Sequence, residues 1–259
     1  MSGAMTPSMQ RRLFGRSLLL QAFWSFERMQ SLGFAFCLDP WIERCWSGRD
    51  EEIREARLRH QEYFNTQPYM ASLVIGMVCA LEEAAAGATD ADRPAKIERL
   101  KALKSAAAAA LAGVGDAMFW GALRPFCAAL ALTCALALRQ RPMEAAVCAA
   151  GVYLIAHNAP ALWLRWRFLR LGYEWKDQIA VRLKSWPGQK AIRALRASGL
   201  ALALVSGVLL LGAVPAPQRP IGLLALVAAL LLSLARVSAY RIYAAAAGAG
   251  YLAYLAGWM

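Results

Sequence analysis

The sequence predicts an all-α integral membrane protein, in which interfacial and re-entrant helices are followed by C-terminal transmembrane helices. Of the 259 residues, 59% are hydrophobic and 18% are charged, whereas soluble domains are about 45–50% apolar and about 25% charged. The apolar residues form long uncharged runs, such as the 22 residues between Arg196 and Arg219. Since about 20 helical residues cross the hydrocarbon core of a bilayer, this pattern excludes a disordered or fibrous chain and disfavours a purely cytosolic enzyme.

The net charge of +12 is concentrated in one segment. Residues 165–196 contain nine Lys and Arg but only two acids, Glu174 and Asp177. Basic loops of membrane proteins face the cytoplasm, so this segment predicts the cytoplasmic side of a multi-pass protein. Because it lies between apolar runs, membrane lipid is a better partner for it than nucleic acid, which we do not expect to bind.

The first elements are predicted to lie on the membrane rather than to cross it. We expect residues 1–10 to be a disordered tail. Residues 11–36 combine Leu, Phe and Trp with Arg and Glu, which is typical of an interfacial helix, and Asp39-Pro40 should end it. Residues 49–62 predict a polar helix with charges three and four apart. Residues 82–104, with five acids and five bases, predict an aqueous loop and a short helix.

Polar segments interrupt the apolar runs of the middle of the chain. Asn65-Thr66-Gln67-Pro68 precedes one run, Gly113-Val114-Gly115-Asp116 lies within residues 105–138, and Asn158-Ala159-Pro160 lies within residues 143–164. Backbone can leave a helix at membrane depth only where protein or a water-filled cavity covers it. The three segments therefore predict re-entrant or broken helices that line a substrate path.

Three apolar segments, 198–214, 221–235 and 242–258, close the chain and predict transmembrane helices. After the tail, the chain is thus expected to divide into a core over 11–196, with interfacial, re-entrant and broken helices, and a C-terminal membrane portion over 197–259.

Asp116 and Arg124 are two charged residues within an otherwise apolar run. Each would cost about 2.5–3.5 kcal/mol at the centre of a lipid-exposed helix. They are eight residues apart, about two helical turns, so they can share one face. This spacing favours a functional or subunit-interface position, with a structural ion pair or an interfacial position as the alternative.

One enzyme class must be weighed. Gly113-Val114-Gly115-Asp116 matches G-x-G-D and Pro160-Ala161-Leu162 matches P-A-L, which together resemble the intramembrane aspartyl proteases of the presenilin type. That chemistry needs two carboxylates that share a proton. The upstream acid nearest to an apolar run is Asp39, which follows Leu38 rather than the Tyr of that family. The protease is therefore a remote alternative.

The remaining residues predict neither a metal site nor a cofactor. The six Cys show no C-x-x-C spacing and are interpreted as small apolar side chains. The chain has two His, of which His60 is expected to be a surface residue of the polar helix or a residue with a role. No phosphate-binding loop is present.

Several longer motifs resemble one family. The chain is similar to the D subunit, or IID component, of the mannose/fructose/sorbose family of sugar phosphotransferase systems. The matching stretches occur in the order of that family: Arg16–Phe34, His60–Tyr69, Ala80–Glu83, Leu111–Pro125 and Asn158–Tyr173.

The resemblance implies a role in the bacterial cytoplasmic membrane. In this family, C and D subunits form the path for a hexose, as an oligomer of C–D pairs, and soluble A and B subunits carry the phosphoryl group. The D subunit is then a non-catalytic subunit without a cofactor. The sugar would be phosphorylated as it is delivered to the cytoplasm.

The same motifs imply two groups of site residues, transferred by position. The first is expected to bind the sugar or the C subunit: Glu27, Arg28, Gln30, Asn65, Thr66, Gln67 and Asn158. The second is expected to form a re-entrant turn: Gly113, Gly115, Asp116, Trp120 and Arg124.

Departures from the family pattern leave a second interpretation open. Ala106–Ala110 replace a stretch that usually contains Gly and Pro, which favours a continuous helix. Ser25-Phe26 replace Asn-Tyr, and the loop at Pro215–Pro220 is short. The alternative function is a non-transporting, regulatory scaffold for phosphotransferase domains. Which sugar is carried does not follow from the sequence.

Overall fold

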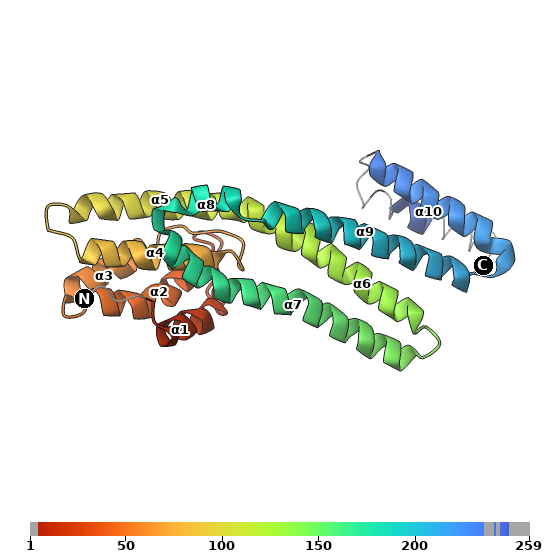
Figure 1. Cartoon of the computed structure of the whole chain (residues 1–259), viewed down its shortest axis with the longest axis horizontal. Helices are drawn as coiled ribbons and strands as arrows, with labels where there is room; N and C mark the ends of the chain where they lie inside the picture. Colours follow the sequence, from red (N-terminus) through yellow and green to blue (C-terminus); the bar gives the residue numbers. More distant parts are fainter. Residues whose placement is uncertain (1–4, 236–240, 242–243, 249–259) are drawn as a thin grey trace. The chain divides into compact units, whose positions relative to one another are not determined.

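The computed structural model describes residues 5–235, 241 and 244–248, and its regular elements are helices joined by short loops (Figure 1). Of the 17 residues of the predicted C-terminal segment 242–258, all but residues 244–248 fall outside the described residues. The helices are α1 (Pro7–Ser17), α2 (Ser31–Cys45), α3 (Asp50–Arg59), α4 (Ala71–Ala86), α5 (Arg93–Gly115), α6 (Arg124–Ala137), α7 (Pro142–Trp175), α8 (Ile179–Ser185), α9 (Gly188–Ala213) and α10 (Arg219–Leu234), with a π-helical segment η1 (Asp116–Leu123) between α5 and α6.

Three continuous helical stretches are long and apolar enough to cross a membrane. They run over Arg93–Ala137, Pro142–Leu183 and Gly188–Ala213, and a shorter apolar helix covers Ala216–Leu232. A span of 26 residues at 1.5 Å per residue exceeds the thickness of the hydrocarbon core. The all-helical membrane class is therefore confirmed.

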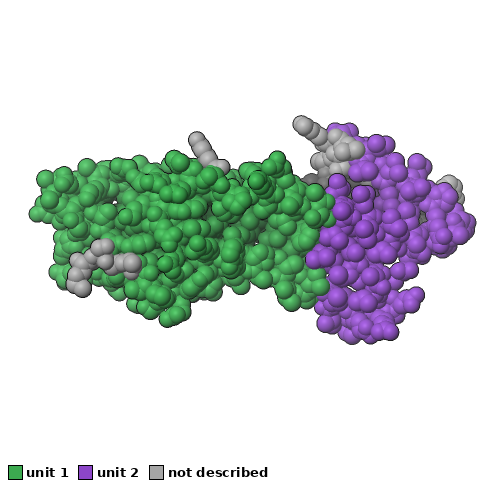
Figure 2. All heavy atoms as spheres, viewed as in Figure 1, with its two compact units in different colours: residues 1–128, 150–199 green, residues 129–149, 200–259 purple. Residues whose placement is uncertain are grey.

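The chain forms two compact units, which Figure 2 shows in different colours. Unit 1 contains residues 1–128 and 150–199, and unit 2 contains residues 129–149 and 200–259. The hairpin between α6 and α7 thus groups with the C-terminal helices. The sequence-based boundary at residue 196 stays a prediction.

Unit 1 is built around α4, of which nearly every side chain is buried. Two glycines allow the backbone of α4 to touch that of α7. A Cβ atom on Gly76 would lie 2.0 Å from the Leu169 carbonyl oxygen, and one on Gly172 would lie 2.0 Å from the Leu73 carbonyl oxygen. Any side chain at these two positions would push the helices apart.

Two N-terminal boundaries differ from the predicted ones. The tail ends before residue 10, because Thr6 caps α1 by accepting a hydrogen bond from the Met9 amide and Pro7 takes the first helical position. The predicted interfacial helix over 11–36 is interrupted after Ser17 and resumes as α2 at Ser31. The polar helix α3 lies within the predicted range 49–62.

Prolines do not end the helical stretches in which they lie. Pro40 lies inside α2, and the carbonyl of Phe36, four residues earlier, accepts a hydrogen bond from Arg16 Nη1 at 2.7 Å. Pro125 follows η1, and the carbonyl of Gly121 accepts one from Arg196 Nε at 3.2 Å. An arginine from another helix thus replaces each backbone bond that proline removes.

The middle of the chain is more continuous than expected. The predicted loop over 82–104 is mostly helical, since α4 extends to Ala86 and α5 begins at Arg93. The chain stays helical through Gly113–Asp116, where it passes into the π-helical segment, and α7 passes through Pro160 without ending. The breaks expected at Gly113–Asp116 and Asn158–Pro160 are therefore absent in this part of the chain.

Unit 2 pairs its helices through a few polar and many apolar contacts. Thr133 Oγ1 lies 2.9 Å from Ser206 Oγ and also donates to the carbonyl of Ala129. Between α9 and α10, a groove with a volume of about 210 Å³ is lined by apolar side chains only. Hydroxyl contacts between otherwise apolar helices are typical of helix packing in a lipid bilayer.

Candidate functional site

The motif segments converge on residues Phe64–Tyr69, which connect α3 to α4. Gln30 holds this segment from one side: its Nε2 donates to the Thr66 carbonyl at 2.8 Å, and its Oε1 accepts from the Thr66 amide at 3.2 Å. The backbone nitrogen of Gln30 also donates to the Phe64 carbonyl at 2.9 Å. Gln30 and Thr66 are buried. They therefore position backbone rather than face a ligand.

Gln67 plays a similar part at the start of α4. Its Oε1 accepts hydrogen bonds from the amides of Tyr69 at 2.7 Å and Met70 at 3.2 Å. Gly115 packs directly on it, since a Cβ there would lie 2.5 Å from Gln67 Cβ, whereas Gly113 has open space around it. Of the two glycines predicted to form a turn, only Gly115 is required, and it is required for helix packing.

The charged and aromatic residues of the second motif lie on η1 and at the start of α6. Asp116, Trp120 and Arg124 are exposed, and the Arg124 guanidinium lies 5.1 Å from the centre of the Trp120 ring. Among the described residues, Asp116 and Arg124 do not form the ion pair that was one of the predicted alternatives. A π-helical segment is uncommon and often marks a functional position.

Four of the side chains predicted to bind the sugar or the C subunit are exposed. Glu27 and Arg28 lie exposed on the loop before α2, next to the buried Gln30, and Asn65 is exposed between two buried residues. Met29 adopts a φ of 54°, a left-handed conformation that is unusual for such a side chain. Asn158 is exposed on α7, and its Nδ2 donates to the Leu154 carbonyl.

A small pocket lies between these segments and α7. We call it the Arg165 pocket, and it has a volume of about 230 Å³, lined by Leu18, Leu20, Gln21, Pro68, Tyr69, Trp120 and Arg165. Tyr69 also packs on Phe119, with ring centres 4.7 Å apart, and its hydroxyl lies 3.5 Å from His157 Nε2. Four of the five matching stretches, distant in the sequence, therefore meet at this pocket.

Arg165 and Tyr69 were not among the predicted site residues. Arg165 Nη2 donates to the Pro68 carbonyl at 2.8 Å, and the guanidinium lies 5.2 Å from the centre of the Tyr69 ring. One signal in the sequence could have found Arg165, because it is the first charge after the 20 uncharged residues that follow Glu144.

A second buried ionic group, the Glu82 cluster, lies between α3, α4 and α5. Both carboxylate oxygens of Glu82 are bonded, by Arg59 Nε at 2.7 Å, Arg59 Nη2 at 3.0 Å, His60 Nε2 at 2.8 Å and Trp46 Nε1 at 2.8 Å. Lys104 Nζ donates to the Arg59 carbonyl. His60 is fully buried, so the expectation of a surface residue was wrong.

The protonation states of the Glu82 cluster follow from this geometry. Burial alone would raise the pKa of Glu82, but the hydrogen bonds from His60 and Arg59 outweigh it and hold that pKa well below its usual range. Burial lowers the pKa of His60 despite the neighbouring carboxylate. The cluster thus holds a carboxylate, a guanidinium and a neutral imidazole that donates through Nε2.

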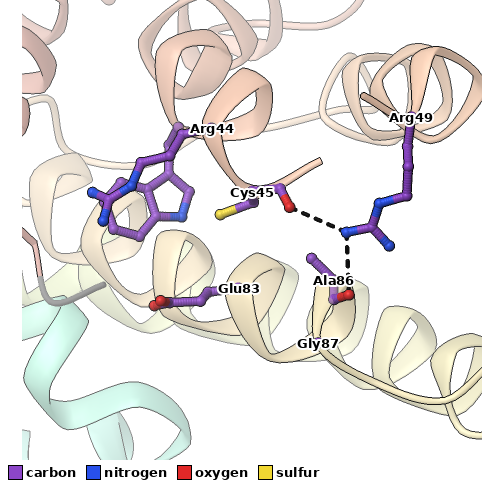
Figure 3. A pocket seen from close by; sticks show the side chains of 7 residues that line it. Arg44, Cys45, Arg49, Glu83, Ala86 and Gly87 are labelled. Carbon is purple, nitrogen blue, oxygen red and sulfur yellow. Dashed lines mark hydrogen bonds between the residues drawn. The ribbon is translucent and has the colours of Figure 1, made fainter. Parts of the chain in front are cut away.

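A polar pocket of about 260 Å³ lies at the ends of α2 and α4. In Figure 3, Arg49 reaches across it and donates to the carbonyls of Cys45 and Ala86, both at 3.2 Å. Arg44 lies over the Trp41 ring, and Glu83 accepts from Tyr173. Burial raises the pKa of the Cys45 thiol to about 12, so this thiol is protonated at neutral pH and is a poor nucleophile.

The arrangement does not support acid–base catalysis by paired carboxylates. Asp39, the second acid that an aspartyl protease would need, is held by Arg57 at 2.8 Å and Arg16 at 3.4 Å. Among the described residues, the ion-pair partners of Asp39 are thus two arginines rather than the second carboxylate that this chemistry needs. Within the described residues, no three His, Cys, Asp or Glu side chains are grouped to hold a metal ion.

Comparison with known proteins matches most of the chain. The sequence model of the PTS system mannose/fructose/sorbose family IID component matches residues 4–214. The PTS system mannose-specific EIID component of Escherichia coli (strain K12) is 44% identical over 126 residues, which are 49% of this chain and 43% of that protein. The sorbose-specific EIID component of Klebsiella pneumoniae is 34% identical over 161 residues, 62% of this chain and 54% of that protein. The chain spans about half the length of these curated relatives.

Two solved structures resemble the whole chain. One, described as the structure of a membrane protein, is 28% identical, covers 98% of both chains and has a TM-score of 0.73. The other is the cryoEM structure of the mannose transporter ManYZ in complex with microcin E492, which is 28% identical, covers 97% of both chains and has a TM-score of 0.57.

Proposed function

The chain belongs to the mannose/fructose/sorbose family of phosphotransferase system IID components, which are multi-pass bacterial membrane proteins, and we propose that it acts with a C subunit as the membrane part of a sugar permease. The hexose would pass along the two subunits and be phosphorylated as it reaches the cytoplasm. Soluble A and B subunits would supply the phosphoryl group, and this chain would take no covalent part in the reaction.

The observation that carries this proposal is the convergence of the motif segments on Phe64–Tyr69. Buried amides of Gln30 and Gln67 hold the backbone of that segment, and Asn65 remains exposed on it. Amide and carboxylate groups on a held backbone suit the hydroxyl groups of a sugar, because a backbone that is already ordered loses little entropy on binding. We assign Asn65, Glu27, Arg28 and Asn158 to contact with the sugar or the C subunit.

The buried members of the predicted site then have a supporting role. Gln30, Thr66 and Gln67 position the segment, and Gly115 lets α5 approach it. Asp116, Trp120 and Arg124, exposed on and next to η1, are proposed to face the C subunit.

A re-entrant arrangement of α4 and α5 is part of the proposal. The helix α4 has 16 residues and is buried on all sides, and the first half of α5 is rich in charge. Such a pair suits a hairpin that enters the membrane only partly, with protein covering its ends.

Uptake in cells that lack their own sugar phosphotransferase permeases tests the proposal. The cells would express this chain with its C, A and B subunits and receive labelled mannose, fructose, glucose or an amino sugar. We expect accumulation of sugar phosphate that depends on phosphoenolpyruvate and is lost in Asn65→Ala. Gln140→Ala, an exposed amide in the hairpin before α7, is the matched control and should retain uptake.

A regulatory scaffold is the second candidate, and one observation favours it. The helix α5 runs unbroken through Ala106–Ala110, where a hinge of Gly and Pro would let parts of a transporter move. A stable complex with the C, A and B subunits that accumulates none of the sugars would contradict transport and support this function.

A further inference from the structure

We propose that the Arg165 pocket receives the carboxylate of an aspartate or glutamate side chain from the C subunit. The inference rests on the proposed function, which supplies the partner, and names the chemistry by which the partner is recognised. It assigns to Arg165 the role of an anchor in the subunit interface.

Arg165 is a buried charge without an acidic partner among the described residues. Only 6% of the surface of Arg165 is exposed, and its contacts are a hydrogen bond to the Pro68 carbonyl and a ring contact with Tyr69. Its Nε is buried without a partner, and within the described residues no carboxylate forms an ion pair with it. A buried guanidinium is normally paired, so the anion is expected from outside the chain.

The surface around the pocket exposes apolar and aromatic side chains. Trp120 and Leu18 line the pocket and are 45% and 49% exposed. The same loop continues into Phe23 and Trp24, which are about half exposed as well. An arginine at the centre of an aromatic and apolar rim is typical of the residues that contribute most to protein–protein affinity.

The lining of the pocket favours a protein carboxylate over a lipid phosphate. Pockets for anionic lipid headgroups gather several Lys and Arg, whereas the Arg165 pocket is lined by one cation together with Gln21 and apolar or aromatic residues. A single planar guanidinium with one nitrogen already bonded to protein fits one carboxylate. An apolar segment of the C subunit that carries one acid therefore matches both the pocket and its rim.

The test measures association of the purified chain with its C subunit in detergent. We expect Arg165→Gln to weaken association by at least about tenfold, because a desolvated charge pair is lost, and Arg165→Lys to weaken it less. Arg167→Gln removes an exposed charge two residues away on the same helix and should leave association unchanged. Replacing each membrane-facing Asp or Glu of the C subunit by Asn then identifies the partner acid, since that change should add nothing in the Arg165→Gln background.

Three outcomes would decide against the inference. Wild-type association of a folded Arg165→Gln variant would overturn it directly. If Arg165→Gln loses binding to phosphatidylglycerol vesicles but associates with the C subunit as the wild type does, the pocket would be assigned to lipid instead. If Arg165→Gln does not fold, Trp120→Ala alters only the exposed rim, and unchanged association would count against the interface. Failure of the unchanged chain to bind any C subunit would instead contradict the proposed function itself.

Discussion

Unit 1 contains two buried guanidinium groups, Arg59 and Arg165, and their surroundings differ. Arg59 makes two hydrogen bonds to Glu82, whose remaining bonds come from His60 and Trp46. Arg165 has a backbone carbonyl and a tyrosine ring as partners, and a cavity of about 230 Å³ beside it. Arg59 has its carboxylate partner within the chain, whereas Arg165 borders a pocket on the side where exposed aromatic residues gather.

The difference separates stability from recognition. A closed ionic cluster can be worth little overall, yet removing one member leaves an uncompensated buried charge. In an open pocket, the isolated subunit carries the free-energy cost of the unpaired buried charge until a partner supplies an opposite charge. Buried charge alone therefore does not indicate function, and the completeness of its partners is the more informative observation.

The largest expected effect comes from opening the closed site. Glu82→Gln would leave Arg59 buried without a carboxylate, and we expect the free energy of unfolding to fall by about 3–5 kcal/mol. Thermal unfolding of the purified protein in detergent measures this change. Glu51→Gln, which removes an exposed partner of Arg54 on α3, is the control and should leave the melting temperature unchanged. Equal stability of the two variants would contradict the distinction between the sites.

Packing of Gly115 against Gln67 gives the next largest effect. Gly115→Ala would place a Cβ within 2.5 Å of Gln67 Cβ, so we expect a loss of about 1–3 kcal/mol from overpacking. Gly113→Ala meets no atom within 4 Å and should be neutral, or stabilising by up to about 1 kcal/mol through helix propensity. Chemical denaturation of both variants makes the comparison, and similar losses would argue against close packing at Gly115.

The amide that holds Phe64–Tyr69 should affect stability, whereas the amide exposed on that segment should not. Gln30→Ala removes two buried hydrogen bonds, each worth on the order of 1 kcal/mol. Asn65→Ala should leave the melting temperature unchanged and lower only sugar uptake. Measuring both properties for both variants sharpens the division between supporting and contacting residues. A destabilised Asn65→Ala would remove the case for a contact role.

The smallest effect expected is a pH dependence of stability that belongs to the Glu82 cluster. Because the pKa of His60 is lower in the folded protein than in the unfolded chain, the unfolded state binds the proton first as pH falls. Stability should therefore be full above about pH 6.5, the usual pKa of histidine, and decrease below it. His60→Gln should flatten the stability curve between pH 7.5 and 5.5, and an unchanged slope would show that other groups cause it.

Prolines illustrate where reasoning from sequence fails in this protein. Pro40, Pro125 and Pro160 each lie in a segment that could be expected to break, and local chemistry supports that expectation. The helices nevertheless continue, with Arg16 and Arg196 bonding carbonyls near the first two. Those arginines are 24 and 71 residues away in the chain, so no local pattern could have indicated the compensation. His60 was misjudged for a similar reason, because its partner Glu82 lies on another helix.

Composition and hydropathy by themselves determined that the chain is an all-helical membrane protein, because the length of an apolar run and its lack of charge are local properties of the sequence. The motifs likewise identified the family. Only the tertiary structure decided that Gln30 and Gln67 support the backbone, that Glu82 is fully paired and that Arg165 is not. Burial and pairing are relations between distant residues, and they exist only once the helices have packed.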